Sequence, residues 1–176
     1  SQIKALAPDA RIIVLLRDPV ERAFSQYLFS RRRGYEDLSF QEALESETER
    51  IEAEEEFLKA RGRGVAWRYR ENAYVKRGLY YEQLVNWFDA FSREQILVID
   101  SARLKHGKQA TFDEVLSFLG LPPYRLSDKG EYNRAPAKDE EIRQSEVDYL
   151  TAFYREPNEQ LFELLKSHYC GSDFSW

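Results

Sequence analysis

Several residue types are absent or scarce in this chain, and each absence excludes a class of protein. Cys170 is the single cysteine among 176 residues, so no internal disulfide can form and no oxidising compartment is implied. No apolar run approaches the roughly 20 residues that a membrane-spanning helix needs, and no signal-peptide pattern opens the chain. The two histidines, His106 and His168, lie far apart and lack ligand spacing, so we expect no metal site.

Methionine is missing altogether, including at position 1. The chain opens at Ser1, within a stretch (Ser1–Leu6) that we interpret as a helix leading into a strand. We therefore expect a fragment of a larger domain whose beginning is not included. A methionine-poor protein with a processed terminus is the alternative.

The overall composition is that of a folded globular domain, with 43% hydrophobic and 32% charged residues. The length suits a single domain over residues 1–176, and we find no internal repeat or low-complexity linker that would divide it. The net charge of -5 argues against a general polyanion binder, and no nucleic-acid partner is expected, while a local basic patch stays open.

Two short aliphatic runs are typical of strands buried on both faces of a parallel sheet, Ile12–Leu16 and Gln95–Ile99. Helix-like segments separate them, which predicts an α/β domain with parallel strands in one sheet. Two strands fall short of a stable sheet. We expect the remaining strands to lie in the missing part of the domain or to come from another chain.

Helices are predicted wherever capping residues precede an apolar periodicity. Ser39 and Thr111 each begin a capping box, and the glutamate-rich run after Ser39 is interpreted as a solvated helix face. The predicted helices cover Val20–Arg32, Ser39 to about Gly62, Leu79–Phe91, Thr111–Gly120, Glu140–Tyr154 and Pro157–Tyr169.

Arg17 stands at the carboxyl end of the first strand, where open α/β sheets bind their ligands. Asp18 and Pro19 suit the start of the next helix, whose amino end offers unpaired amides to an anion. Ser25 lies about two turns further on. An anion clamp of Arg17 and Ser25 is one interpretation. An arginine paired with a nearby acid, with Ser25 as a small packing residue, is the other.

The stretch RIIVLLRDPVERAFSQYL (Arg11 to Leu28) resembles the second signature of the sulfotransferase superfamily, an arginine followed eight positions later by a serine. GLYYEQLVNWFDAFSREQILVID and TFDEVLSFLGLP resemble the segments that follow in that family, in the same order. The resemblance extends from Ile3 to about Tyr132. It is closest to the branch that holds bacterial and heparan sulfate sulfotransferases.

This resemblance implies a P-loop-like sulfotransferase fold and the donor 3′-phosphoadenosine 5′-phosphosulfate, which leaves adenosine 3′,5′-bisphosphate as product, with no metal. Arg17 and Ser25 would bind the 3′-phosphate. Lys129 and Gly130, with Tyr132, resemble a late loop that also contacts the donor nucleotide. Glu131 departs from the basic residues expected there, and Arg134 is the candidate for the missing charge. A cytoplasmic, bacterial location is implied.

The loop that holds the sulfuryl end of the donor has no counterpart before Arg11, where ten residues are available. The resemblance therefore implies the C-terminal portion of the domain, with the catalytic base upstream of Ser1. We expect this chain alone to bind nucleotide without transferring sulfate. The alternatives are a catalytically silent sulfotransferase-like fragment acting in interaction, and a nucleotide kinase or NTPase of related topology. The absence of a Walker lysine loop disfavours the latter.

The acceptor is expected to be a small molecule or carbohydrate that presents a hydroxyl or amine. The strongest basic and aromatic cluster comprises Arg61, Arg63, Trp67, Arg68, Tyr69 and Arg70. Of these, Trp67, Arg68 and Arg70 are candidate acceptor residues. An ordinary exposed segment with aromatic anchors is the plainer interpretation. Tyr80 is a weaker candidate because its helical spacing favours a place in the core.

Overall fold

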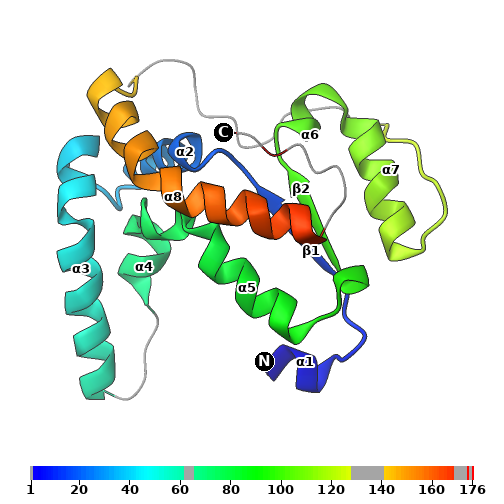
Figure 1. The fold of residues 1–176 in the computed structure, drawn as a ribbon. Helices are drawn as coiled ribbons and strands as arrows, with labels where there is room; N and C mark the ends of the chain where they lie inside the picture. The colour runs from blue at the N-terminus through cyan, green and yellow to red at the C-terminus, as the bar shows by residue number, and fades with distance from the viewer. Residues whose placement is uncertain (1, 62–65, 128–140, 169–173, 175) are drawn as a thin grey trace. The chain divides into compact units, whose positions relative to one another are not determined.

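The computed structural model describes residues 2–61, 66–127, 141–168, 174 and 176. They divide into two compact units: a first unit of Ser1–Arg17, Tyr80–Asn133 and Asn158–Trp176, and a second unit of Asp18–Leu79 and Arg134–Pro157. The elements, in chain order (Figure 1), are α1 (Gln2–Leu6), β1 (Ile12–Leu16), α2 (Pro19–Arg32), α3 (Phe40–Arg61), α4 (Trp67–Asn72), η1 (Lys76–Gly78), α5 (Tyr80–Ala90), η2 (Arg93–Gln95), β2 (Ile96–Asp100), α6 (Arg103–His106), α7 (Lys108–Leu119) and α8 (Gln144–His168).

The sheet of the first unit consists of β1 and β2, which pair in parallel. The register places Ile12 opposite Ile96 and Leu16 opposite Asp100. Both strands were expected from their aliphatic runs, and their parallel pairing is confirmed. A crossover of helices separates them along the chain, as a parallel connection requires.

The two faces of β1 differ in burial. On one face Leu16 packs with Ile96 and Val98 of β2. Leu84 of α5, Phe91 just after that helix, and Leu161 and Leu165 of α8 complete the core of this unit. On the other face Ile13 is 38% and Leu15 56% exposed. The prediction that this strand is buried on both faces is therefore wrong for the described part of the chain, because the helices found there cover one side of β1.

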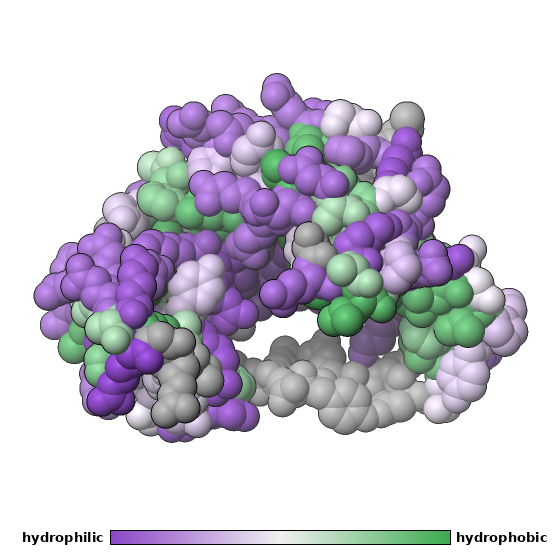
Figure 2. Space-filling view, turned by 90° about the horizontal axis from the view of Figure 1, so that it is seen from below, coloured by the Kyte–Doolittle hydropathy of each residue, from purple (hydrophilic) through white to green (hydrophobic). Residues whose placement is uncertain are grey.

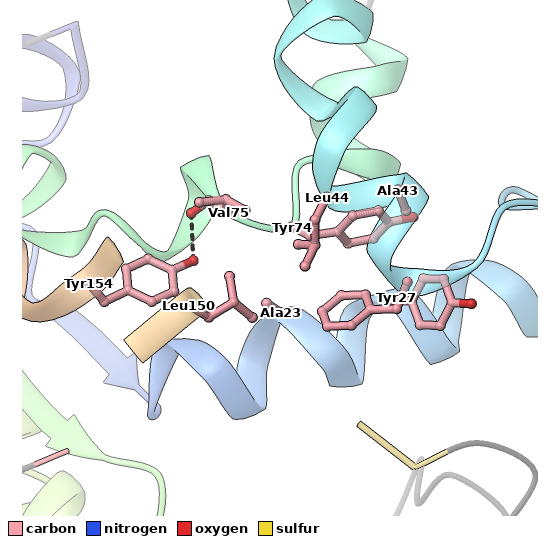
Figure 3. Packing of buried hydrophobic residues seen from close by; sticks show 9 residues of the cluster. Ala23, Tyr27, Ala43, Leu44, Tyr74, Val75, Leu150 and Tyr154 are labelled. Atoms are coloured by element: carbon pink, nitrogen blue, oxygen red, sulfur yellow. Dashed lines mark hydrogen bonds between the residues drawn. The ribbon is translucent and has the colours of Figure 1, made fainter. Parts of the chain in front are cut away.

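The core of the second unit is built from α2, α3, the segment after α4 and the first half of α8. Aromatic residues fill it: the ring centroids of Tyr27 and Phe40 are 4.9 Å apart, and those of Tyr27 and Tyr74 are 5.9 Å apart. Tyr154 of α8 closes one side by donating its hydroxyl to the carbonyl of Val75 at 2.8 Å (Figure 3). Side chains distant in sequence thus share one core.

The capping residues predict some helix ends and miss others. At the start of α3 the Ser39 amide donates to Glu42 Oε2 at 2.9 Å, and the Glu42 amide points back at Ser39 Oγ at 3.4 Å, so this capping box is confirmed. The second predicted capping box, at Thr111, is wrong. Helix α7 begins at Lys108, and Thr111 is a buried residue inside it.

The last two predicted helices form one continuous helix, α8, with Pro157 inside it. A proline removes one backbone hydrogen bond but has a φ angle that a helix accepts. The buried residues on either side of it keep helical spacing: Leu150, Tyr154, Leu161 and Leu165. Packing on both sides of Pro157 therefore outweighs the cost of the lost bond.

The face of the molecule in Figure 2 is largely hydrophilic, with hydrophobic residues gathered in separate patches. None of the helices in the described residues is long and apolar enough to cross a bilayer.

Candidate functional site

The end of β1 is fixed by hydrogen bonds to its backbone. The hydroxyl of Tyr80, at the start of α5, donates to the carbonyl of Arg17 at 3.0 Å. The amide of Ser101 donates to the carbonyl of Leu16 at 2.7 Å, just beyond the last strand pair. Arg17 is half-buried. Its main chain is thus held in place, as a ligand-binding residue at a strand end requires.

Asp18 caps helix α2, as predicted. Its Oδ1 accepts the amides of Val20 at 2.8 Å and Glu21 at 2.9 Å, and its carbonyl accepts the amide of Arg22 at 2.9 Å. These are the amides that we expected an anion to find unpaired. That expectation is wrong for Val20 and Glu21, because the Asp18 carboxylate already occupies the amino end of the helix. An anion bound beside α2 would depend on side chains.

Ser25 lies on an exposed face of α2. The buried face of the helix carries Ala23, Tyr27 and Ser30, and the hydroxyl of Ser30 donates to the carbonyl of Glu71 at 2.7 Å. Ser25 is therefore not the small packing residue of the plainer interpretation. Arg17 belongs to the first unit and Ser25 to the second, and each is described within its own unit.

Arg22 and Gln26 connect α2 to α4 and to the segment that follows it. Arg22 Nη1 donates to Gln26 Oε1 at 2.8 Å, and Arg22 Nη2 donates to the carbonyl of Tyr74. Gln26 Nε2 in turn donates to the carbonyl of Arg70 at 3.1 Å. Because these residues lie within one turn of Ser25, they set the orientation of the helix that presents it. No local pattern in the sequence marks Arg22 or Gln26 as functional.

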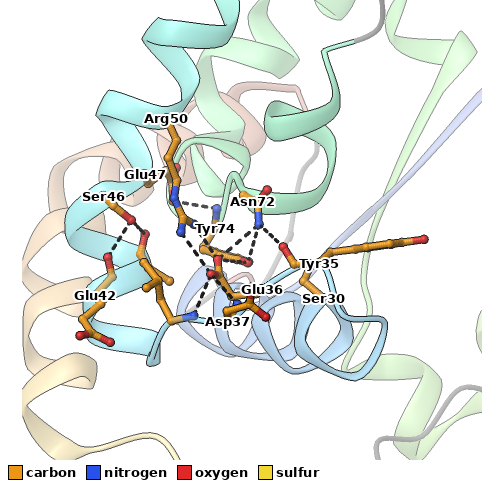
Figure 4. Close-up of polar contacts among 12 residues, drawn as sticks. Ser30, Tyr35, Glu36, Asp37, Glu42, Ser46, Glu47, Arg50, Asn72 and Tyr74 are labelled. Carbon is orange, nitrogen blue, oxygen red and sulfur yellow. Dashed lines mark hydrogen bonds and ion pairs between the residues drawn. The ribbon is translucent and has the colours of Figure 1, made fainter.

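A buried polar network surrounds Glu36, which is 4% exposed (Figure 4). Arg50 donates two hydrogen bonds to its carboxylate, at 2.7 and 3.2 Å, and the hydroxyl of Tyr74 donates a third at 2.9 Å. Burial acts to raise the pKa of Glu36. The hydrogen bonds from Arg50, the Leu38 amide and Tyr74 outweigh it, so the pKa lies below its ordinary value.

Glu47 of α3 is 2% exposed, so it does not belong to the solvated helix face that the glutamate run predicted. Its carboxylate accepts three consecutive backbone amides, those of Tyr74 and Val75 at 2.7 Å and that of Lys76 at 2.8 Å. Burial raises the pKa of Glu47, although these hydrogen bonds act to lower it. The burial of Glu47 could have been predicted from its spacing, because it lies three residues after Leu44 and four before Ile51, on the apolar stripe of the helix.

The predicted acceptor residues do not all lie together. Trp67, Arg68 and Arg70 are on α4, in the second unit. The guanidinium of Arg70 already forms an ion pair with Glu71 at 2.7 Å and a cation–π contact with the Trp67 ring at 4.7 Å. Tyr80 is 8% exposed and packs in the core of the first unit. Its place in the core is confirmed, and a role towards the acceptor stays a prediction.

The remaining predicted donor residues, Lys129, Gly130 and Tyr132, lie outside the described residues, as do Arg134 and Cys170. His168 stacks on Phe88 with ring centroids 4.1 Å apart. Among the described residues, no group of three or more histidine, cysteine, aspartate or glutamate side chains is arranged to hold a metal ion.

A family comparison covers the site and most of the chain. The model of the sulfotransferase domain matches residues 2–147, which include Arg17, Ser25, the buried network and α4. The chain belongs to the sulfotransferase domain family. The resemblance predicted from the arginine and serine signature is thereby confirmed.

Related proteins agree with this assignment. Carbohydrate sulfotransferase 15 of Mus musculus is 30% identical over 142 residues, 78% of this chain and 25% of that protein. The bifunctional heparan sulfate N-deacetylase/N-sulfotransferase 3 of Mus musculus is 26% identical over 193 residues, 92% of this chain and 20% of that protein. This chain thus spans a quarter or less of the curated relatives that it matches.

A solved structure supports the fold directly. The sulfotransferase from Alicyclobacillus acidocaldarius superimposes with a TM-score of 0.72 at 30% sequence identity, covering 93% of this chain and 57% of that one. The predicted fold class, a helix-rich α/β domain with a parallel sheet, is therefore confirmed.

Proposed function

We propose that this chain binds the 3′-phosphate end of 3′-phosphoadenosine 5′-phosphosulfate, as part of a sulfotransferase that transfers the sulfuryl group to a hydroxyl or amine. The observation that carries the proposal is the pair Arg17 and Ser25, one ending β1 and the other exposed on α2, within a chain of the sulfotransferase family. The relatives named for carbohydrate and heparan sulfate substrates favour a carbohydrate acceptor over other small molecules.

The side chains of Arg17 and Ser25 each suit a phosphate. A guanidinium offers a planar fork of donors, and a serine hydroxyl donates one more hydrogen bond. Asp18 already satisfies the amides of Val20 and Glu21, so side chains have to supply the binding energy. Replacing Arg17 should therefore remove most of the affinity. Lys129, Gly130 and Tyr132 remain further candidates by resemblance.

The donor supplies the reactive sulfuryl group, and its in-line transfer needs a base on the acceptor and positive charge on the leaving phosphate. Arg17 and Ser25 would act by holding the nucleotide, which fixes the position of the sulfur. We propose that other residues of the full enzyme supply the base.

Calorimetric titration with adenosine 3′,5′-bisphosphate tests this proposal. Arg17→Ala should weaken binding by roughly 1.5–3 kcal/mol, the usual scale for hydrogen bonds to a charged group, and Ser25→Ala should weaken it less. Arg155→Ala, which removes an exposed arginine from α8, is the control for the change in charge. Binding of ATP in preference to the bisphosphate would support a nucleotide kinase or NTPase instead. Equal nucleotide affinity in all three variants would show that Arg17 and Ser25 do not bind the phosphate.

A further inference from the structure

A surface rich in arginine and aromatic side chains forms where the end of α2 meets the start of α4, within the second unit. Arg32 and Arg33 end α2, and Trp67 and Arg68 open α4. The ring of Tyr35 packs edge-on against the indole of Trp67, with centroids 5.1 Å apart, and so joins the two segments. We call these five residues the basic–aromatic surface.

The aromatic rings of this surface are turned towards solvent. Trp67 is 41% and Tyr35 38% exposed, although residues close to them in the chain, Glu36 and Asn72, are buried. The side chain of Tyr35 extends away from the polar network around Glu36, while its carbonyl accepts a hydrogen bond from Asn72 at 3.1 Å (Figure 4). The backbone of Tyr35 is therefore anchored and its ring is presented outward.

Within the described residues, Arg32, Arg33 and Arg68 make no ion pair, whereas Arg50, Arg70 and Arg103 are each paired with a glutamate. Arg33 stacks over the Phe29 ring at 4.4 Å, which steadies the guanidinium and leaves its edge for hydrogen bonds.

Two acids near the surface pair with arginines outside it, and a third, Glu54, lies against the surface itself. Glu36 binds Arg50, and Glu71 binds Arg70. Glu54 accepts the amides of Arg68 at 2.7 Å and Tyr69 at 3.1 Å, and so caps α4. Asp37 is the exposed acid nearest to Tyr35 in the sequence. In a chain with a net charge of -5, three unpaired arginines beside exposed rings form a local positive field.

We infer that the basic–aromatic surface binds an anionic polysaccharide, one that carries carboxylate or sulfate groups on its sugar rings. Guanidinium forks match both groups, and the exposed rings offer flat apolar contact to the faces of the sugars. Nucleic acid is the other class of polyanion, and the binding test below separates it from the acidic polysaccharides. The inference names the acceptor class of the proposed transferase and rests on that proposal for the reaction, though not for binding.

The surface changes the set of acceptor residues predicted from the sequence. Trp67 and Arg68 stay in it, and Arg32, Arg33 and Tyr35 join them from the end of α2. Arg70 is left out because Glu71 and Trp67 already occupy its guanidinium. Tyr80 lies in the other unit.

Binding measurements on the full chain test the inference with labelled polygalacturonate, dextran sulfate, uncharged dextran and single-stranded poly(dT). The variant Arg32→Ala/Arg33→Ala/Arg68→Ala should bind both acidic polysaccharides about tenfold or more weakly, with a shallower dependence on salt. The control Arg125→Ala/Arg155→Ala/Lys166→Ala removes the same charge from three exposed positions and should stay within about twofold of the wild type. Tyr35→Ala should weaken polysaccharide binding without changing the salt dependence.

Three results would overturn the inference: equal weakening in the two triple variants, no weakening in either, or tighter binding of poly(dT) than of the acidic polysaccharides at the same ionic strength.

Titration with adenosine 3′,5′-bisphosphate on the same proteins separates this inference from the proposed function. The surface variant should keep the nucleotide affinity of the wild type. If the wild type binds acidic polysaccharide through this surface but does not bind the nucleotide, the proposed function is wrong and the polysaccharide site is supported. If it binds the nucleotide but not the polysaccharide, only the polysaccharide site is wrong.

Discussion

Glu36 and Glu47 are both buried glutamates of the second unit, and their pKa values are shifted in opposite directions. Glu36 meets a guanidinium, from Arg50, in addition to hydroxyl and amide donors. Glu47 meets three backbone amides, and burial outweighs them. A cation in direct contact therefore decides the direction of the shift, as expected where desolvation and charge pairing compete.

Replacing Glu36 should make stability less dependent on pH. The pKa of Glu36 is lowered by folding from 4.5, so its contribution is fully present above about pH 4.5 and is lost as the pH falls through the lowered value. Glu36→Gln should cost roughly 1.5–3 kcal/mol at pH 7. Urea unfolding across pH 3 to 7 measures this: the difference from wild type should shrink below about pH 4.5. The exposed Glu55→Gln is the control, and a constant difference at every pH would contradict the assignment.

Gly78 is required by the close approach of Tyr154. A Cβ at position 78 would lie 2.5 Å from the Tyr154 hydroxyl, which donates to the Val75 carbonyl. Gly78→Ala should therefore displace the tyrosine and cost about 1–3 kcal/mol in the free energy of unfolding. At Gly107 the nearest atom would be 3.6 Å away, so Gly107→Ala is the matched control. Additive effects of Gly78→Ala and Tyr154→Leu in a double-mutant cycle would show that the two residues do not compete for space.

At the scale of elements, the sequence predicts those features that depend on local pattern. The two strands, their parallel pairing and the start of α3 follow from aliphatic runs and from the Ser39 capping box. The failures arise where tertiary packing decides. The apparent cap of α7, Thr111, is instead buried inside that helix, and α8 continues through Pro157 because buried residues on both sides of the proline hold it in place.

The exposed face of β1 gives a test at the same scale. Leu15 is 56% exposed and Leu16 is 2% exposed, although they are neighbours in one strand. Leu16→Ala should cost about 2–5 kcal/mol in the free energy of unfolding, the usual range for a core leucine. Leu15→Ala should stay within about 0.5 kcal/mol of the wild type. Chemical denaturation of this chain measures both. A large loss for Leu15→Ala would mean that this face is covered.

At the scale of the whole molecule, the candidate site could be predicted in part. The spacing of Arg17 and Ser25 identifies the family, because a strand end and the helix after it are local features. The hydrogen bonds from Arg22 and Gln26 to α4 and the segment after it join residues more than 40 positions apart, and no local pattern predicts them. The same holds for the contact of Tyr35 with Trp67, which creates the basic–aromatic surface.

The last prediction concerns turnover: this chain of 176 residues should bind adenosine 3′,5′-bisphosphate and transfer no sulfate. Sulfuryl transfer needs the sulfur, the acceptor oxygen or nitrogen and a base held in line. Three buried carboxylates of the second unit are engaged in other contacts: Glu36 with Arg50, Glu71 with Arg70, and Glu47 with backbone amides. The chain also covers 57% of the solved bacterial relative, so we expect the base among residues with a counterpart in the remainder.

An assay with donor labelled in the sulfuryl group, over a panel of hydroxyl and amine acceptors that includes acidic polysaccharides, measures this turnover. Nucleotide binding without product is the expected result. Product formation would place the base within this chain, and Glu82 would be the first residue to replace, since it is exposed near the start of α5, two residues from the tyrosine that anchors Arg17. Loss of turnover in Glu82→Gln with unchanged nucleotide affinity would then assign the proton transfer to it, because a base acts on the acceptor and not on the bound 3′-phosphate.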